Sequence, residues 1–219
     1  MGNLIMVLGR SGSGKSRSLK GFGKGECGVF SVAHKRLPFK GELPVDTRPT
    51  YARIEASLRQ NKLRAYVVDD ANYLMAFKNF ELAEIKGYDK FVTMAKDFET
   101  LLLCAANTSE DTNVYFLMHS DLDSEGREKP KTIGRMLDEK LCVEGMFPIV
   151  IDARVRVDDE GTHYEFVTRN DGYNLAKAPE GMLPEVMPND LKAVDTAIRD
   201  YWGMGPIVAE ANDNKSKEQ

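Results

Sequence analysis

The stretch VLGRSGSGKSRSLKGFG near the N-terminus has the spacing of a phosphate-binding loop. Gly9, Gly14, Lys15 and Ser16 satisfy the pattern G-x-x-x-x-G-K-[ST]. The apolar run NLIMVL precedes the pattern as a buried strand would, and KSRSLKGF follows it as a short helix. This order suits the chemistry, because glycines let backbone N–H groups converge on a phosphate at the start of a helix.

Each residue of this loop has an expected part in binding a nucleotide. The Lys15 side chain would reach the β and γ phosphates, and the Ser16 hydroxyl would ligate Mg²⁺. The pattern therefore predicts ATP and Mg²⁺ as cofactors, against the alternative of an ordinary glycine-rich turn. The predicted nucleotide-binding residues are Gly9, Arg10, Ser11, Gly12, Ser13, Gly14, Lys15, Ser16 and Arg17.

A second feature is the pair of aspartates that ends the run RAYVVDD. The apolar residues from Ala65 to Val68 predict a buried strand that leads into Asp69 and Asp70. Asp69 is the predicted metal ligand, and Asp70 is the predicted acid that polarises an attacking water. The alternatives are a strand-end cap for Asp69 and a purely structural role for Asp70.

A third feature is His119, at the end of the run NVYFLMHS. A polar residue at the tip of the next core strand would lie close to the γ-phosphate and report whether it is present. We therefore predict a catalytic or sensor role for His119, with a structural histidine as the alternative.

The remaining pattern predicts one α/β domain with a mostly parallel central sheet. The 219 residues are 42% hydrophobic, enough to bury a full core. We expect this domain to span residues 1–205, with a disordered tail over 206–219. Helices are expected at 51–61, 88–108, 132–142 and 188–202. Further strands are expected at 26–33, 113–120, 147–157 and 162–170. Loops are expected at 34–50 and 121–131, and the loop at 121–131 is expected to be mobile.

Charge and hydropathy restrict the classes of partner. The net charge of −4 argues against a chain that binds nucleic acid through overall positive charge. One face can nevertheless be basic, because residues 1–40 contain a single acid, Glu26, and eight basic residues: Arg10, Lys15, Arg17, Lys20, Lys24, Lys35, Arg36 and Lys40. No apolar run approaches the roughly 20 residues of a membrane span, and we expect a cytoplasmic protein without membrane partners.

The order of these parts resembles the RecA-like P-loop NTPase core, with a C-terminal β-hairpin and helix. The chain more closely resembles the bacteriophage P-loop ATP-binding proteins of the Sak-type single-strand-annealing family. The matching segments are GRSGSGKSRSL, RLPFKG, VVDDANYLM, GYDKF, FLMHS, KTIGRMLDEK, FVTRNDGYNLAKAPEGM and MPNDLKAVDTAIRDYW, which span about residues 3–202. The P-loop is common to many proteins, whereas TIGRMLDEK together with AKAPEGM is far more specific.

The resemblance implies an ATPase that forms rings or filaments and handles single-stranded DNA in phage recombination or replication, with proteins of those processes as candidate partners. ATP would lie between subunits and meet a positive group from the neighbour, for which the candidates are Lys177, Arg135 and Arg169. DNA would face the loops expected at residues 76–90 and 121–131. The candidate contacts there are Lys78, Lys86, Lys90, Arg127, Lys129 and Lys131, with Phe77 or Phe80 stacking on bases.

One departure from the RecA-like pattern leaves other functions open. RecA-type recombinases have a catalytic glutamate just past the second strand, about where this chain has Ala33. Hydrolysis is expected to be slow unless Asp70 takes that role. The alternatives are a nucleotide-gated scaffold with little hydrolysis and a small nucleotide kinase, since kinase P-loops are similar to GRSGSGKS.

Overall fold

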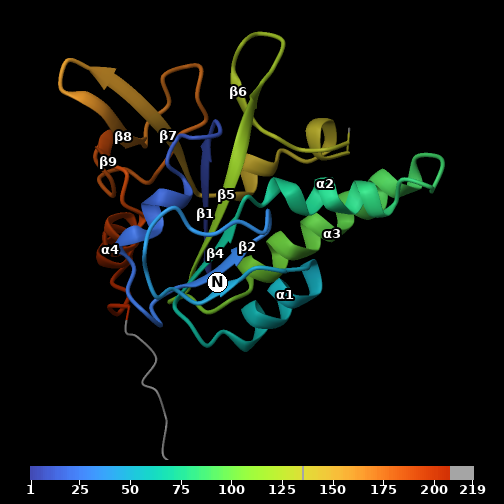
Figure 1. Cartoon of the computed structure of the whole chain (residues 1–219), viewed down its shortest axis with the longest axis horizontal. Coiled ribbons are helices and arrows are strands. Elements are labelled where there is room, and N and C mark those ends of the chain that lie inside the picture. The colour runs from blue at the N-terminus through green and yellow to red at the C-terminus, as the bar shows by residue number, and fades with distance from the viewer. Residues whose placement is uncertain (135, 208–219) are drawn as a thin grey trace, which may run out of the picture.

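The computed structural model describes residues 1–134 and 136–207, and these form one central sheet covered by helices (Figure 1). The strand order is β3-β2-β4-β5-β1-β7-β8-β9, and β6 pairs with the end of β5 outside this path. The strands are β1 (Asn3–Gly9), β2 (Gly28–Ser31), β3 (Val45–Asp46), β4 (Ala65–Asp69), β5 (Asn113–Leu122), β6 (Glu128–Pro130), β7 (Ile149–Asp158), β8 (Gly161–Val167) and β9 (Val186–Pro188).

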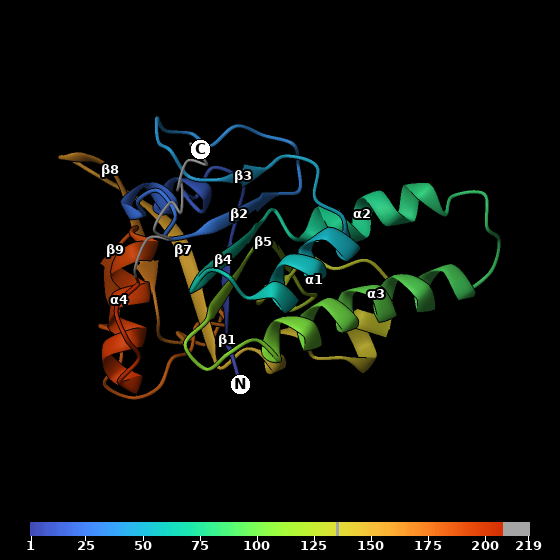
Figure 2. The ribbon, with the colours of Figure 1, turned by 90° about the horizontal axis from the view of Figure 1, so that it is seen from below.

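Helices cover both faces of the sheet (Figure 2). The α-helices are α1 (Tyr51–Gln60), α2 (Asn72–Glu81), α3 (Asp89–Ala106) and α4 (Leu191–Trp202). The shorter helices are the 3₁₀-helices η1 (Ser16–Gly21) and η3 (Val143–Met146) and the π-helix η2 (Met136–Lys140).

Alternate residues of β1 pack into two different hydrophobic cores. Met6 packs with the buried residues of α1, α2 and α3, whereas Val7 packs with those of α4 and η1.

The pairing confirms an α/β fold with a mostly parallel sheet and an antiparallel C-terminal part. Strands β3, β2, β4, β5, β1 and β7 run parallel, and β7, β8 and β9 are joined antiparallel. In this register Gly9 lies opposite His119, and Ser31 lies opposite Asp69. The ends of four neighbouring strands therefore meet at one edge of the sheet, where the predicted site residues are.

Three expectations for local structure were wrong. Residues 76–90 are not a continuous loop, because α2 extends to Glu81. Residues 121–131 form a β-hairpin in which Asp121 pairs with Lys129, and its turn is closed by Asp123, whose carboxylate accepts from the backbone of Glu125 and Arg127. The helix expected over 132–142 is reduced to η2, which starts only after Gly134, a residue with φ 97°.

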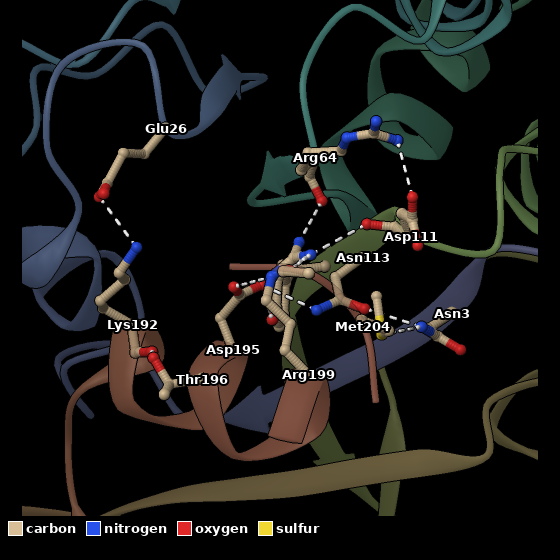
Figure 3. A network of polar contacts seen from close by, with 12 residues as sticks. Asn3, Glu26, Arg64, Asp111, Asn113, Lys192, Asp195, Thr196, Arg199 and Met204 are labelled. Atoms are coloured by element: carbon tan, nitrogen blue, oxygen red, sulfur yellow. Dashed lines mark hydrogen bonds and ion pairs between the residues drawn. The ribbon is translucent and has the colours of Figure 1, made fainter. Parts of the chain in front are cut away.

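A buried polar network attaches α4 to the edge of the sheet opposite this site (Figure 3). Asp195 and Arg199 are one helical turn apart, and Nε of Arg199 donates to Oδ2 of Asp195 over 2.7 Å. The other carboxylate oxygen accepts from the Asn113 amide and the Tyr115 hydroxyl at 2.8 and 2.7 Å. The rest of the guanidinium donates to main-chain carbonyls, including that of Arg64 at 2.7 Å. Both buried charges are thus compensated.

No helix in the described residues combines the length and apolar character needed to cross a bilayer. Residues 208–219 of the predicted tail, and the candidate Arg135, lie outside the described residues.

Candidate phosphate-binding site

The glycine-rich loop joins β1 to η1 at the edge where the parallel strands end. Gly9, Gly12 and Gly14 have φ of 153°, 83° and 89°, conformations that favour glycine. A Cβ at Gly9 would stand 2.5 Å from Oγ of Ser13 and 2.6 Å from the carbonyl oxygen of Ala153. The loop is therefore tightly wrapped. The helix after it is a six-residue 3₁₀-helix, so less dipole is available than from the expected α-helix, and the positive potential depends more on the Lys15 side chain.

The Lys15 ammonium lies inside this loop. Its Nζ donates to the carbonyl oxygens of Gly9 at 2.7 Å and Arg10 at 3.0 Å, and the residue is 5% exposed. Burial lowers the pKa of Lys15 to about 8, although the charges of Asp70 and Asp69 act in the opposite direction. The loop therefore holds a cation at its centre that is poorly solvated, and an anion is the partner that would stabilise it best.

The structure brings Ser16 and Asp69, the two predicted metal ligands, into contact. The Ser16 hydroxyl donates to Oδ1 of Asp69 over 2.9 Å. Burial, together with the negative charge of the neighbouring Asp70, raises the pKa of Asp69 to about 6, while the hydrogen bond from Ser16 and the charge of Lys15 oppose this. Mg²⁺ prefers such hard oxygen ligands and takes one or two from a protein, with phosphates and waters completing the shell. The donor set fits Mg²⁺.

Asp70 is engaged at both carboxylate oxygens, by Lys35 and by His119. Nζ of Lys35 lies 2.9 Å from its Oδ2, and Nε2 of His119 lies 3.1 Å from its Oδ1. Burial alone would raise the pKa of Asp70, but hydrogen bonds from His119 and Lys35 outweigh it and lower the pKa to about 2. A carboxylate with both oxygens occupied and so low a pKa is a weak base. The contacts favour a positioning role for Asp70, which fixes the His119 ring at the strand end.

A cavity of about 1040 Å³ opens beside the loop. Its walls come from loop residues 10–13, the start of α2, the β5–β6 hairpin, the end of β7 and the segment around Tyr173. His119 lines it, whereas Lys15, Ser16 and Asp69 do not. The cavity is therefore next to the tip of the loop, and it has the volume of a site for a molecule of nucleotide size.

The three candidates for a positive group delivered to a neighbouring subunit differ in their surroundings. Arg169 donates to the main-chain carbonyls of Thr168, Ala178 and Leu183 within its own chain. Lys177 is exposed, and its backbone is held by two hydrogen bonds to Val150. With Arg135 outside the described residues, Lys177 is the candidate whose surroundings suit this role.

The candidate DNA contacts occupy two projections, the tip formed by α2 and α3 and the β5–β6 hairpin. Lys78 is ion-paired with Asp97 at 3.4 Å, and Arg127 is ion-paired with Asp123 at 2.9 Å. Lys86 and Lys131 are exposed, and Lys90 and Lys129 are half-buried. Phe80 is 74% exposed, whereas Phe77 is 37% exposed, stacks on His34 and packs at a tilt against Tyr73. Phe80 is thus the more available aromatic ring.

Sequence reasoning missed two residues that the structure brings to the site. Lys35 was expected only as part of a basic surface, yet it binds Asp70. Glu128 was expected in a mobile loop, yet it lines the cavity. Neither residue belongs to a recognisable sequence motif. Each is brought to the site by the pairing of strands that are distant in the sequence.

Comparison with known proteins does not place this site in a family. No protein-family model matches the chain, and no curated protein matches it. The chain is an α/β protein whose mostly parallel mixed sheet presents a glycine-rich loop and two aspartates at one edge.

Proposed function

We propose that the chain is a RecA-like P-loop ATPase that binds Mg-ATP at interfaces between its copies and acts on single-stranded DNA in phage recombination or replication. The observation that carries this proposal is the 2.9 Å hydrogen bond between Ser16 and Asp69, which joins the last residue of the loop motif, at the start of η1, to a buried acid at the end of β4. That pairing is what a Mg-nucleotide site needs and what a simple glycine-rich turn lacks.

The strand order supports the ATPase over a nucleotide kinase. The strand with Asp69 does not pair with β1, because β5 lies between them. His119, the last residue of β5 that pairs with β1, is therefore set between the phosphate loop and the aspartates, the place expected of a sensor in a RecA-like core. A kinase needs an arginine-rich lid, yet the hairpin beside the cavity has one arginine, Arg127, which pairs with Asp123 and Glu125.

The residues of this chain have distinct parts in the proposed reaction. Lys15 would exchange its contacts with the Gly9 and Arg10 carbonyls for contacts with phosphate oxygens. Ser16 and Asp69 would hold Mg²⁺, which when bound neutralises charge on the phosphates. His119, held by Asp70, would contact the γ-phosphate and respond to its loss.

Free phosphate released from Mg-ATP, with and without single-stranded DNA at fixed salt, tests this function. We expect turnover that DNA increases, and we expect Lys15→Ala to lose both ATP binding and turnover. Lys20→Ala, an exposed lysine in the helix after the loop, is the matched control and should behave as the original chain. A phosphorylated acceptor in place of free phosphate would identify a kinase instead.

Nucleotide affinity is expected to be highest between about pH 6 and pH 8. The pKa of Asp69 is raised to about 6, so acid protonates it and weakens the Mg-dependent part of binding. The pKa of Lys15 is lowered to about 8, so alkali removes its charge before phosphate binds. Affinity then falls by up to about tenfold per pH unit. Dissociation constants measured from pH 5 to 9.5, with and without Mg²⁺, check this. An acid limb that persists without Mg²⁺ would contradict the role of Asp69.

A nucleotide-gated scaffold is the second candidate, and the contacts of Asp70 favour it. Both Asp70 carboxylate oxygens are engaged, and Ala33 lies in the turn after β2 where an acid was expected. Tight ATP binding without phosphate release would support the scaffold. We expect Asp70→Asn to lower turnover less than Asp69→Asn does, because its part is to position His119; equal losses would make Asp70 a direct participant.

A further inference from the structure

Most carboxylates around the loop and the cavity are already committed to partners. Asp69 accepts from Ser16, Asp70 is held by Lys35 and His119, and Asp152 is ion-paired with Arg154. Asp121 is exposed and accepts from the backbone of Leu122. None of these four is well placed to take a proton from an attacking water.

Glu128 differs from them in having a carboxylate oxygen that is buried and has no hydrogen-bond partner among the described residues. Its backbone N–H donates to the carbonyl of Tyr173 over 2.7 Å, which fixes the residue on β6. Its side chain lines the cavity beside the phosphate loop and accepts a hydrogen bond from Ser120. Oε2 is buried, with no hydrogen-bond partner among the described residues. A buried acceptor without a partner is costly, so a ligand or water that donates to it would be favoured.

The electrostatic surroundings of Glu128 suit a proton acceptor. Burial raises the pKa of Glu128, while its hydrogen bond from Ser120 and the charges of Arg154 and Arg10 oppose the shift. A carboxylate with a raised pKa accepts protons more readily than Asp70, whose pKa is lowered. The charge of Glu128 also acts on Lys15, which places it within electrostatic range of the phosphate-binding lysine.

We propose that Glu128 is the catalytic base of this site and takes the part of the acid that is missing at Ala33. This inference rests on the proposed ATPase function. Oε2 would accept a proton from the attacking water as the water oxygen forms its bond to the γ-phosphorus. The bond between that phosphorus and the bridging oxygen breaks, ADP leaves with the electron pair, and the proton passes from Glu128 to solvent.

Glu128→Gln tests the proposal, with binding and turnover measured on the same full-length protein. We expect phosphate release to fall by about 100-fold while the dissociation constant for ATP changes less than threefold. Glu125→Gln is the matched control, because Glu125 is an exposed acid in the turn of the same hairpin, and it should leave both quantities unchanged. Formate added to Glu128→Ala should restore part of the lost turnover, which a merely structural residue would not allow.

The outcomes separate this inference from the proposed function. Turnover of Glu128→Gln within threefold of the original chain overturns the catalytic role and leaves the ATPase intact. If the original chain binds ATP and releases no phosphate, both the ATPase and the catalytic role fail. Should the Gln variant lose its fold, Glu128→Asp keeps the charge and withdraws the carboxylate by one methylene. An Asp variant with unchanged turnover would then overturn the proposal, and a loss of tenfold or more at unchanged ATP affinity would support it.

Discussion

Asp69→Asn is expected to lower Mg-ATP turnover by about 100-fold or more and to remove the dependence of nucleotide binding on Mg²⁺. The amide keeps the shape of the carboxylate and still offers an oxygen to the Ser16 hydroxyl, so the fold should survive. It removes the negative charge that a divalent cation needs at this position. Phosphate release, together with ATP dissociation constants at several Mg²⁺ concentrations, measures both effects.

The control for this variant is a second aspartate at the end of a parallel strand. Asp46 ends β3 and pairs with Arg53 over 2.9 Å, away from the loop. Asp46→Asn should leave turnover and the Mg²⁺ dependence as they are. Binding that still strengthens with Mg²⁺ after Asp69→Asn would mean that other residues hold the metal.

Arg199→Leu is expected to lower the free energy of unfolding by about 3–5 kcal/mol. Arg199 is 3% exposed and Asp195 is fully buried, so removing the guanidinium leaves a buried carboxylate supported only by Asn113 and Tyr115. Main-chain carbonyls that accept from Arg199 also lose their donor. Urea denaturation followed by circular dichroism measures the change.

Two further variants separate the network from a general effect of losing an arginine. Arg59 forms an ion pair with Glu55 on the surface of α1 with its side chain 65% exposed, and Arg59→Leu should change stability by about 0.5 kcal/mol or less. Combining Asp195→Asn with Arg199→Leu removes the uncompensated charge and should recover part of the loss. A double variant less stable than Arg199→Leu alone would show that Asp195 acts independently of its partner.

The parts of the fold that sequence predicts are those with a strong local pattern. The apolar run before Gly9 predicts β1, and the spacing of Met94, Phe98 and Leu102 predicts α3, because burial on one face leaves a visible period. Helix α2 was missed because its N-cap residue, Ala71, makes no side-chain capping hydrogen bond, and because the helix follows closely on β4, which ends at Asp69. A helix start without a capping residue leaves no mark in the sequence.

The parts of the site that sequence predicts follow the same rule. Ser16 and Asp69 could be paired in advance because each ends a recognisable motif. Lys35 and Glu128 could not, since the first approaches Asp70 through the turn after β2 and the second through pairing of β6 with β5. Such contacts depend on register and on side-chain direction, which a run of charged residues does not encode.

The ten-residue strand β5 links the interior of the protein mechanically to its surface. Residues 113–119 pair with β1, and the strand continues without a break into 120–122, which pair with β6. At about 3.3 Å per residue, the last three residues extend roughly 10 Å from His119. No loop separates the hairpin from the core, so no flexible segment between them would absorb a displacement of the hairpin. Such a displacement would therefore be passed along β5 to His119, the histidine that Asp70 holds.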